Sequence, residues 1–157
     1  MKSAIVYYSY SGNTHKAAQC LSGALKSRGE EVVPVRIRPL KEDNNLVLQF
    51  LNTVMGKKPE LYRTLLDLSG FDRVIIGCPV WAFTPTPPVN TYLDKCTSLG
   101  GKKAVAFVTY SVGLGSKQTL SAMKKRLRSK GATEVKTISF KQGQDASLSR
   151  DEFLKIL

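Results

Sequence analysis

The sequence predicts an α/β fold, a doubly wound sheet of five parallel strands with helices on both faces. Short apolar runs alternate five times with segments of helical periodicity along the 157 residues. This alternation is typical of strand–helix–strand units joined by right-handed crossovers. In addition, the run FDRVIIGCPV, residues 71–80, is apolar almost throughout. Such a run is expected of a strand that is buried on both faces of a parallel sheet.

Each predicted strand is a short run rich in β-branched or aromatic residues between turn signals. The predicted strands span residues 2–8, 31–37, 71–80, 103–109 and 134–140. Pro34 lies inside the second run. Because proline cannot donate to a sheet ladder, we expect this strand at an edge of the sheet.

The predicted helices lie between and after these strands and show apolar residues at helical spacing. They span residues 13–28, 46–54, 61–68, 87–96, 116–130 and 148–157. Gly29 and Gly131 follow two of them, at the position where helices often end in glycine. Residues 87–96 begin with prolines, which the first helical turn tolerates. The two helices within residues 46–68 are the least regular, and the sequence MGKKPEL between them predicts a loop.

Length and composition predict one domain, residues 1–157, located in the cytoplasm. Hydrophobic residues at 42% and charged residues at 23% are ordinary for a globular protein. No apolar run approaches the ~20 residues of a membrane-spanning helix. The start, MKSAIVYYS, lacks the longer apolar core and cleavage site of a signal peptide. Three widely spaced cysteines and one histidine do not fit a zinc cluster, so no metal is expected.

Three loops leave the carboxyl ends of predicted strands, the edge where ligands bind in sheets of this kind. They are the first loop, SYSGNT (residues 9–14), the second loop, CPVWAFTPTPP (residues 78–88), and the third loop, YSVGLGS (residues 110–116). Because all three lie at one edge of one sheet, together they predict a single ligand site.

The first loop runs into a helix and predicts a phosphate site. The first amide groups of a helix are unpaired and carry a partial positive charge, which favours anions. Ser9, Ser11 and Thr14 add hydroxyl donors, Asn13 adds an amide, and Gly12 lets the backbone approach closely. No Walker lysine or metal-holding acid accompanies the loop. The loop therefore favours one phosphomonoester over a triphosphate, and a serine-rich helix cap is the structural alternative.

The second and third loops offer surfaces for a flat ligand. Gly113 and Gly115 permit close approach of the backbone, although glycine in loops commonly serves turns. Trp81 is the single tryptophan and lies between prolines after the third strand. This position favours stacking of Trp81 on a ligand over packing in the core.

The first loop resembles the hydroxyl-x-hydroxyl-Gly-Asn-Thr phosphate loop of the flavodoxin and flavodoxin-like FMN-binding family, and the resemblance covers nearly the whole chain. It implies a five-stranded parallel sheet in the order 2-1-3-4-5, with FMN as cofactor. By this likeness, residues 9–14 hold the phosphate, residues 77–83 cover one side of the isoalloxazine ring, and residues 109–115 lie along the other. The implied cofactor-binding residues are Ser9, Tyr10, Ser11, Gly12, Asn13, Thr14, Pro79, Val80, Trp81, Ala82, Phe83, Thr109, Tyr110, Ser111, Gly113, Leu114 and Gly115.

Three features depart from the family's pattern. Many electron-carrying flavodoxins have glycine after the tryptophan, where a peptide flips upon one-electron reduction of the flavin. This chain has Ala82, for which a positive φ costs about 1 kcal/mol or more relative to glycine. The third loop offers Val112 and Leu114 where flavodoxins often place a tyrosine on the ring. Finally, flavodoxins are commonly acidic, whereas this chain has a net charge of +12.

Two functions follow from the resemblance. The first is a flavodoxin, a small soluble FMN-binding electron-transfer protein, and the alternative is an FMN-dependent NAD(P)H or quinone reductase on the same fold. Neither requires a catalytic side chain, because the flavin carries the redox chemistry. A signalling receiver domain of the same strand order is disfavoured, since Cys78 and Pro79 stand where an aspartate is needed.

The basic helix predicted over residues 116–130 has two interpretations. It is either a solvated outer face or a docking surface for an acidic redox partner protein. Its basic residues are Lys117, Lys124, Lys125, Arg126, Arg128 and Lys130. Nucleic-acid binding is not expected, and we expect a monomer or a weak dimer.

Overall fold

The computed structural model of the chain describes residues 1–42, 45–143 and 146–157. The strands are β1 (Lys2–Tyr7), β2 (Glu31–Arg36), β3 (Arg73–Pro79), β4 (Lys103–Tyr110) and β5 (Glu134–Lys141). They pair in parallel in the order β2-β1-β3-β4-β5. The predicted α/β class, a doubly wound five-stranded parallel sheet of order 2-1-3-4-5, is therefore confirmed.

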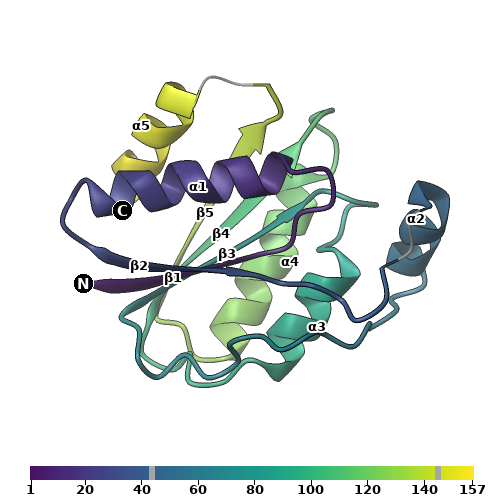
Figure 1. Cartoon of the computed structure of the whole chain (residues 1–157), viewed down its shortest axis with the longest axis horizontal. Coiled ribbons are helices and arrows are strands. Elements are labelled where there is room, and N and C mark those ends of the chain that lie inside the picture. The colour runs from purple at the N-terminus through teal and green to yellow at the C-terminus, as the bar shows by residue number, and fades with distance from the viewer. Residues whose placement is uncertain (43–44, 144–145) are drawn as a thin grey trace.

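The helices cover both faces of the sheet (Figure 1). They are α1 (Asn13–Lys26), α2 (Leu46–Val54), α3 (Pro87–Lys95), α4 (Ser116–Ser129) and α5 (Ala146–Ile156). Helices α1 and α5 pack on one face and α3 and α4 on the other, while α2 stands apart at the side of the sheet where α1 begins (Figure 1). Among the described residues, no helix has the length and apolar character that crossing a bilayer demands.

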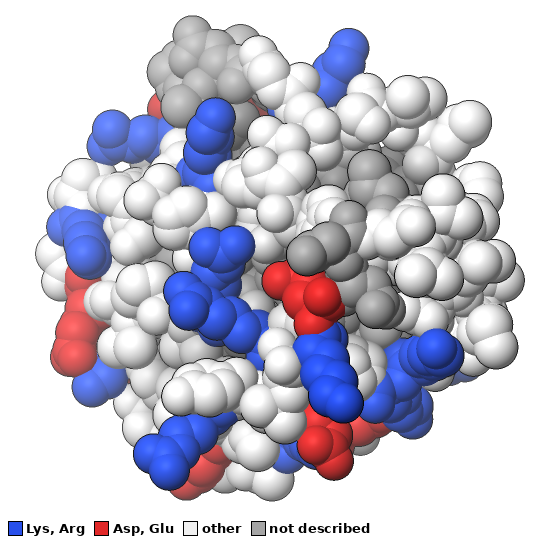
Figure 2. Space-filling view, turned by 45° about the vertical axis from the view of Figure 1, so that its right-hand side comes forward, with Lys and Arg blue, Asp and Glu red and all other residues white. Residues whose placement is uncertain are grey.

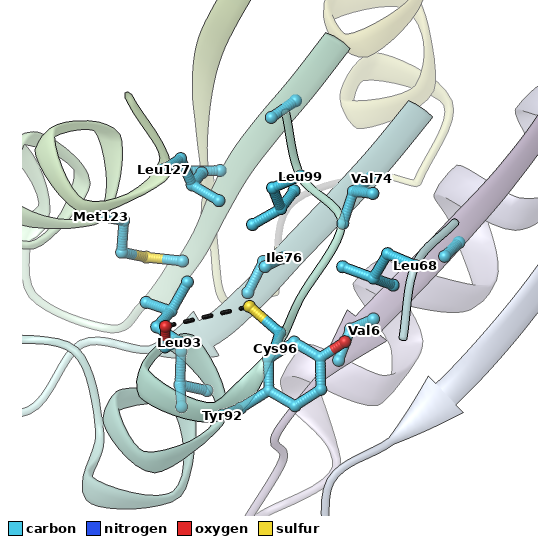
Figure 3. Close-up of a cluster of buried hydrophobic side chains, with 14 of the residues drawn as sticks. Val6, Leu68, Val74, Ile76, Tyr92, Leu93, Cys96, Leu99, Met123 and Leu127 are labelled. Carbon is cyan, nitrogen blue, oxygen red and sulfur yellow. Dashed lines mark hydrogen bonds between the residues drawn. The ribbon is translucent and has the colours of Figure 1, made fainter. Parts of the chain in front are cut away.

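The core has two layers because successive residues of a strand point to opposite faces. Every residue of β3 is buried, as predicted from its continuous apolar run. Val74 and Ile76 join the cluster under α3 and α4, which Figure 3 shows in close-up. Ile75 between them joins the cluster under α1 and α5. Strand β2 is at the edge of the sheet, as Pro34 predicted.

The helix predicted over residues 61–68 is wrong. This segment is irregular, and within the described part of the chain isolated bridges join Leu61 to Pro39 and Asp67 to Thr97. Its leucines nevertheless pack on the core cluster under α3, and Leu68 is fully buried. The other predicted elements begin and end within about two residues of the observed ones.

The three cysteines are free thiols, and Cys78 and Cys96 are buried. The Cys78 sulfur lies 3.9 Å from the Met123 sulfur, and burial raises the pKa of the Cys78 thiol to about 12. Cys96 directs its sulfur to the carbonyl oxygen of Leu93 at 3.8 Å (Figure 3). Both thiols therefore serve as small packing groups, whereas Cys20 is only partly buried.

Candidate functional site

The three loops meet at the carboxyl edge of the sheet, where α1 and α4 begin (Figure 1). The first loop is joined to β4, the strand that leads into the third loop, by the hydroxyl groups of Thr14 and Thr109, which lie 2.8 Å apart. The second loop is held to β4 by the Val80 amide, which donates to the Thr109 carbonyl at 2.9 Å. The sheet order therefore brings together all three segments that the sequence assigned to one ligand site.

The backbone of the first loop has the shape of an anion cradle. Gly12 has a φ of 90° and is the N-cap of α1, whose first turn contains no acidic residue. A Cβ placed on Gly12 would have no heavy atom within 4 Å, so the space beside this backbone is open. The first amides of α1 are thus directed at an accessible position, as phosphate binding requires.

The hydroxyl groups of the first loop fall into two sets. Ser9 and Thr14 are almost fully buried. The Ser9 oxygen accepts the His15 amide at 3.2 Å and retains its own O–H as a donor. Ser11 is exposed and accepts from the Asn13 side-chain amide at 3.1 Å. The buried pair fixes the shape of the loop, and Ser11 and Asn13 are the side chains nearest to solvent.

Arg36, at the end of β2, is a site residue that sequence reasoning missed. Its guanidinium donates to the Ser9 carbonyl at 2.9 Å, so a positive charge lies beside a loop that is itself uncharged. The register pairs Arg36 with Tyr7, immediately before the first loop. The contact could be anticipated only from the strand order, because that order places the end of β2 next to the end of β1.

His15 and Tyr7 form a second contact that the sequence did not indicate. The Tyr7 hydroxyl lies 2.6 Å from Nδ1 of His15, and their rings are 5.6 Å apart. Burial raises the pKa of Tyr7, although the nearby Arg36 and Arg38 act in the opposite direction. The pair braces the first turn of α1 against β1.

The second loop contains a tight turn with two consecutive left-handed residues. Ala82 has a φ of 46° and Phe83 a φ of 62°. The Thr84 amide donates to the Trp81 carbonyl at 3.1 Å and closes the turn. Two positive φ values identify a type I′ turn, which normally contains glycine or asparagine. Strained backbone of this kind clusters at functional sites.

Trp81 is half-buried against two tyrosines. Its ring makes edge contacts with Tyr8 and Tyr10, with ring centroids 5.9 Å and 5.7 Å apart. Tyr8 is itself fixed, because its hydroxyl donates to Glu42 at 2.6 Å, and burial together with this bond strongly raises its pKa. These contacts hold the Trp81 ring in one orientation at the site. Stacking of Trp81 on a ligand stays a prediction.

The third loop closes against the second. Gly115 has a φ of 87° and is the N-cap of α4. A Cβ on Gly115 would lie 2.9 Å from Cδ1 of Phe83 and 3.2 Å from Cγ1 of Val80, so only glycine fits there. Phe83, Val112 and Leu114 are all exposed, and we call these three side chains the apolar rim of the site.

The site combines an open helix N-terminus with an apolar and aromatic surface. In the described part of the chain, no group of three His, Cys, Asp or Glu side chains is arranged to hold a metal ion. The space beside the backbone at Gly12 is open, and phosphate binding there stays a prediction. The turn at residues 81–84 and the third loop lie side by side and present apolar and aromatic groups.

Comparisons with known proteins point in the same direction. A family model described as NADPH-dependent FMN reductase matches residues 1–146. A flavodoxin from Megasphaera elsdenii is 29% identical over 136 residues, which cover 85% of this chain and 81% of that protein.

Solved structures share the fold over nearly the full length. A protein from Bacteroides uniformis that is named as a flavoprotein has a TM-score of 0.76 at 18% identity, covering 98% of this chain and 97% of that chain. A flavoprotein from Lactobacillus acidophilus, in complex with FMN, has a TM-score of 0.68 at 24% identity, covering 99% and 97%. At these identities the structural likeness establishes the fold.

Proposed function

The chain belongs to the NADPH-dependent FMN reductase family, and from its likeness to a flavodoxin and the geometry of its site we propose that it is an FMN-binding electron-transfer protein that docks with acidic partner proteins. The membership and the flavodoxin relative confirm the flavodoxin-like FMN-binding family and FMN as the cofactor. FMN, when bound, supplies the redox chemistry, and the protein supplies binding, orientation and electrostatics.

The observation that carries the proposal is the juxtaposition of an open phosphate cradle with an exposed apolar rim. In our assignment, Ser11, Gly12 and Asn13 hold the phosphate, and Arg36 adds a positive charge beside it. The ring then lies between the turn of the second loop and the third loop. The rim stays exposed there, as is required of a flavin edge that exchanges electrons with another protein.

Helix α4 is the proposed docking surface, because it begins directly after the third loop. Two of its basic residues are held by α3, since Arg126 bonds to Asn90 and Asp94, and Lys130 donates to the Asp94 and Cys96 carbonyls. The remaining basic residues of the helix stay partly or fully exposed. They are Lys117, Lys124, Lys125 and Arg128. This row of charges begins at Lys117, next to the third loop, and runs along α4 to Arg128 in its last turn. An acidic partner would meet the row along its length.

A second candidate, an FMN-dependent NAD(P)H or quinone reductase, is favoured by the turn at Ala82. Flipping the central peptide of a type I′ turn gives a type II′ turn, whose first central residue needs a φ near +60° and a ψ near −120°. That region strongly favours glycine. Ala82 therefore opposes the flip that accompanies one-electron reduction in many flavodoxins, and this favours two-electron chemistry.

Anaerobic reduction of the FMN-loaded protein separates the two functions. For a carrier, we expect NADPH alone to leave the flavin oxidised, whereas a chemical one-electron reductant reduces it in steps. Rapid bleaching by NADPH would identify a reductase. A protein that does not take up FMN would contradict both functions.

The docking surface has its own test. Electron transfer to an acidic acceptor protein is expected to slow as salt is raised, because screening weakens attraction between exposed charges. The double variant Lys125→Gln/Arg128→Gln should show a slower rate and a weaker salt dependence. The matched control Lys26→Gln/Arg28→Gln removes two charges at the end of α1, which packs on the opposite face of the sheet, and should leave the rate unchanged. Equal effects of both variants would contradict docking at α4.

A further inference from the structure

Helix α2 presents its apolar side to solvent and its polar side to the protein. Gln49 and Thr53 are buried, and Asn52 is half-buried. The outward side chains recur at the spacing of a helix stripe and are between 46% and 72% exposed. We call them the α2 apolar face, which consists of Val47, Leu48, Phe50, Leu51, Val54 and Met55.

Polar contacts fix this reversed orientation. Gln49 and Asn52 line a cleft of about 240 Å³ between α2 and the prolines that begin α3. The Gln49 side chain hydrogen-bonds to Tyr8, which follows β1. The Thr53 hydroxyl is satisfied within the helix, because it donates to the Gln49 carbonyl at 2.8 Å. Glu42, on the same cleft, accepts from Tyr8. The helix is thus held through its polar side, and its apolar face is not part of either core cluster.

Basic side chains border the α2 apolar face. Lys41 precedes α2 and Lys57 follows it, and both are exposed and line the cleft beside the helix. Lys58, on the same cleft, forms an ion pair with Asp94 at 2.7 Å. Figure 2 turns this side of the molecule forward and shows a broad uncharged area at the right, with Lys and Arg side chains below it. An apolar stripe bordered by lysines is the pattern of helices that lie in the interface of anionic membranes.

A second copy of the chain fits this surface less well. Each copy has a net charge of +12, so a contact across α2 would bring the same lysines together. The helix has nine residues and is only about 14 Å long. Standard protein interfaces bury roughly 800 Å² on each partner, more than one such helix provides. Insertion of the α2 apolar face into lipid does not require a complementary protein surface.

We propose that the α2 apolar face inserts into the interface of an anionic lipid membrane, with Lys41 and Lys57 next to the headgroups. The proposal is independent of the flavin function, because it concerns residues outside the cofactor-binding set. Membrane binding through α2 would nevertheless keep the candidate site close to the lipid surface. Glu42, beside α2, accepts a hydrogen bond from Tyr8, and the Tyr8 ring contacts Trp81 of the site. Lipid-soluble electron acceptors would then reach the site from the membrane.

Vesicle flotation of the whole protein tests the proposal. We expect binding to vesicles that contain about 30% anionic phospholipid and little binding to purely zwitterionic vesicles. The double variant Phe50→Gln/Leu51→Gln should lower the partition coefficient by at least about tenfold. Phe50→Leu keeps an apolar side chain and should bind like the parent protein. Circular dichroism and FMN uptake check that each variant is folded.

A charge comparison tests the role of the lysines. Lys41→Gln/Lys57→Gln is expected to weaken binding by about fivefold per charge removed. The control Lys125→Gln/Arg128→Gln also removes two positive charges, but from α4, and should weaken vesicle binding clearly less. The proposal is overturned if the parent protein ignores anionic vesicles or if Phe50→Gln/Leu51→Gln binds unchanged. It is also overturned if the parent protein instead forms a dimer that Phe50→Gln/Leu51→Gln abolishes.

Discussion

Tyr8 and Tyr92 are both almost fully buried, but their hydroxyl groups differ in hydrogen bonding. The Tyr8 hydroxyl donates to Glu42, whereas the hydroxyl of Tyr92 is buried and has no hydrogen-bond partner among the described residues. Both rings pack in the same core cluster. The two positions therefore allow the value of one hydrogen bond to be compared within a shared environment.

Replacing each tyrosine by phenylalanine should give effects of opposite sign. Tyr8→Phe loses a hydrogen bond to a charged group and should lower the free energy of unfolding by about 1–2 kcal/mol. Tyr92→Phe removes a desolvated hydroxyl without a partner and should be neutral or stabilising by up to about 1 kcal/mol. Urea denaturation with unchanged m-values measures both. An equal loss in the two variants would show that the Tyr92 hydroxyl has a bound partner such as water.

The left-handed backbone at Ala82 also has a measurable consequence. Ala82→Gly should raise the free energy of unfolding by about 1 kcal/mol, because glycine adopts a positive φ without strain. It should also increase the fraction of one-electron-reduced flavin during stepwise reduction, since glycine permits the peptide flip. Visible absorbance of the FMN-loaded protein follows this fraction.

A variant at another non-glycine residue with a positive φ provides the control. Ser98 has a φ of 63° and lies between α3 and β4. Ser98→Gly should relieve similar backbone strain but also removes the hydrogen bond from the Ser98 hydroxyl to Asp67, so its control value lies in the flavin equilibrium, which should stay unchanged. If Ala82→Gly shifts only stability, the turn does not control the reduction state.

At the scale of elements, the close contact between strands β3 and β4 requires a glycine at position 77. A Cβ on Gly77 would lie 2.0 Å from a ring carbon of the fully buried Phe107. Gly77→Ala should therefore lower the free energy of unfolding by about 3 kcal/mol, the upper end of overpacking effects.

The exposed glycine of α1 should respond in the opposite direction. Gly23 has no neighbouring atom within 4 Å of a placed Cβ and no positive φ. Gly23→Ala should stabilise the protein by about 1 kcal/mol through helix propensity. Thermal or urea unfolding of the two variants measures the contrast. A destabilised Gly23→Ala variant would contradict the geometry of this helix.

The strands could be predicted from sequence because each is a short apolar run that the sheet buries directly. Residues 61–68 show why the same reasoning is weaker for helices. Their leucines contact the core from an irregular segment, so an apolar spacing that suits a helix is satisfied by tertiary contacts instead. The orientation of α2 is also hidden in the sequence, because an amphipathic pattern does not say which side faces the protein.

The candidate site, like the fold, could be predicted only in part from the sequence. The three loops follow from the ends of the predicted strands, and the structure brings them together. Arg36 could not be assigned, because its contact depends on which strands are neighbours. The left-handed φ values of Ala82 and Phe83 were also beyond prediction, since both residues normally avoid that region.

For the whole molecule, the net charge of +12 bears on the reduction potential of a bound flavin. One positive charge at ~10 Å and an effective dielectric of ~40 favours an anionic reduced flavin by ~0.8 kcal/mol, or roughly 35 mV for one electron. We therefore expect the second-electron potential to be less negative than in acidic flavodoxins. It should become more negative as salt is raised, because salt screens exposed charges.

Potentiometric titration at low and high salt checks this expectation. Lys117→Gln removes a charge in the first turn of α4, beside the site, and should make the potential more negative. Lys26→Gln removes one in the last turn of α1, at the far end of the sheet, and should have little effect. A potential that ignores both salt and Lys117 would contradict the electrostatic account.

The position of Pro34 on the outermost strand has a consequence for behaviour at high concentration. An unprotected outer strand offers its free backbone groups to strands of other chains and so initiates fibrous aggregation. Proline removes one donor from β2, and its flanking residues on the exposed side include Glu31 and Arg36. At the opposite border, β5 carries Lys136 and Lys141. Both borders of the sheet therefore resist the addition of further strands, and the protein should remain dispersed at high concentration.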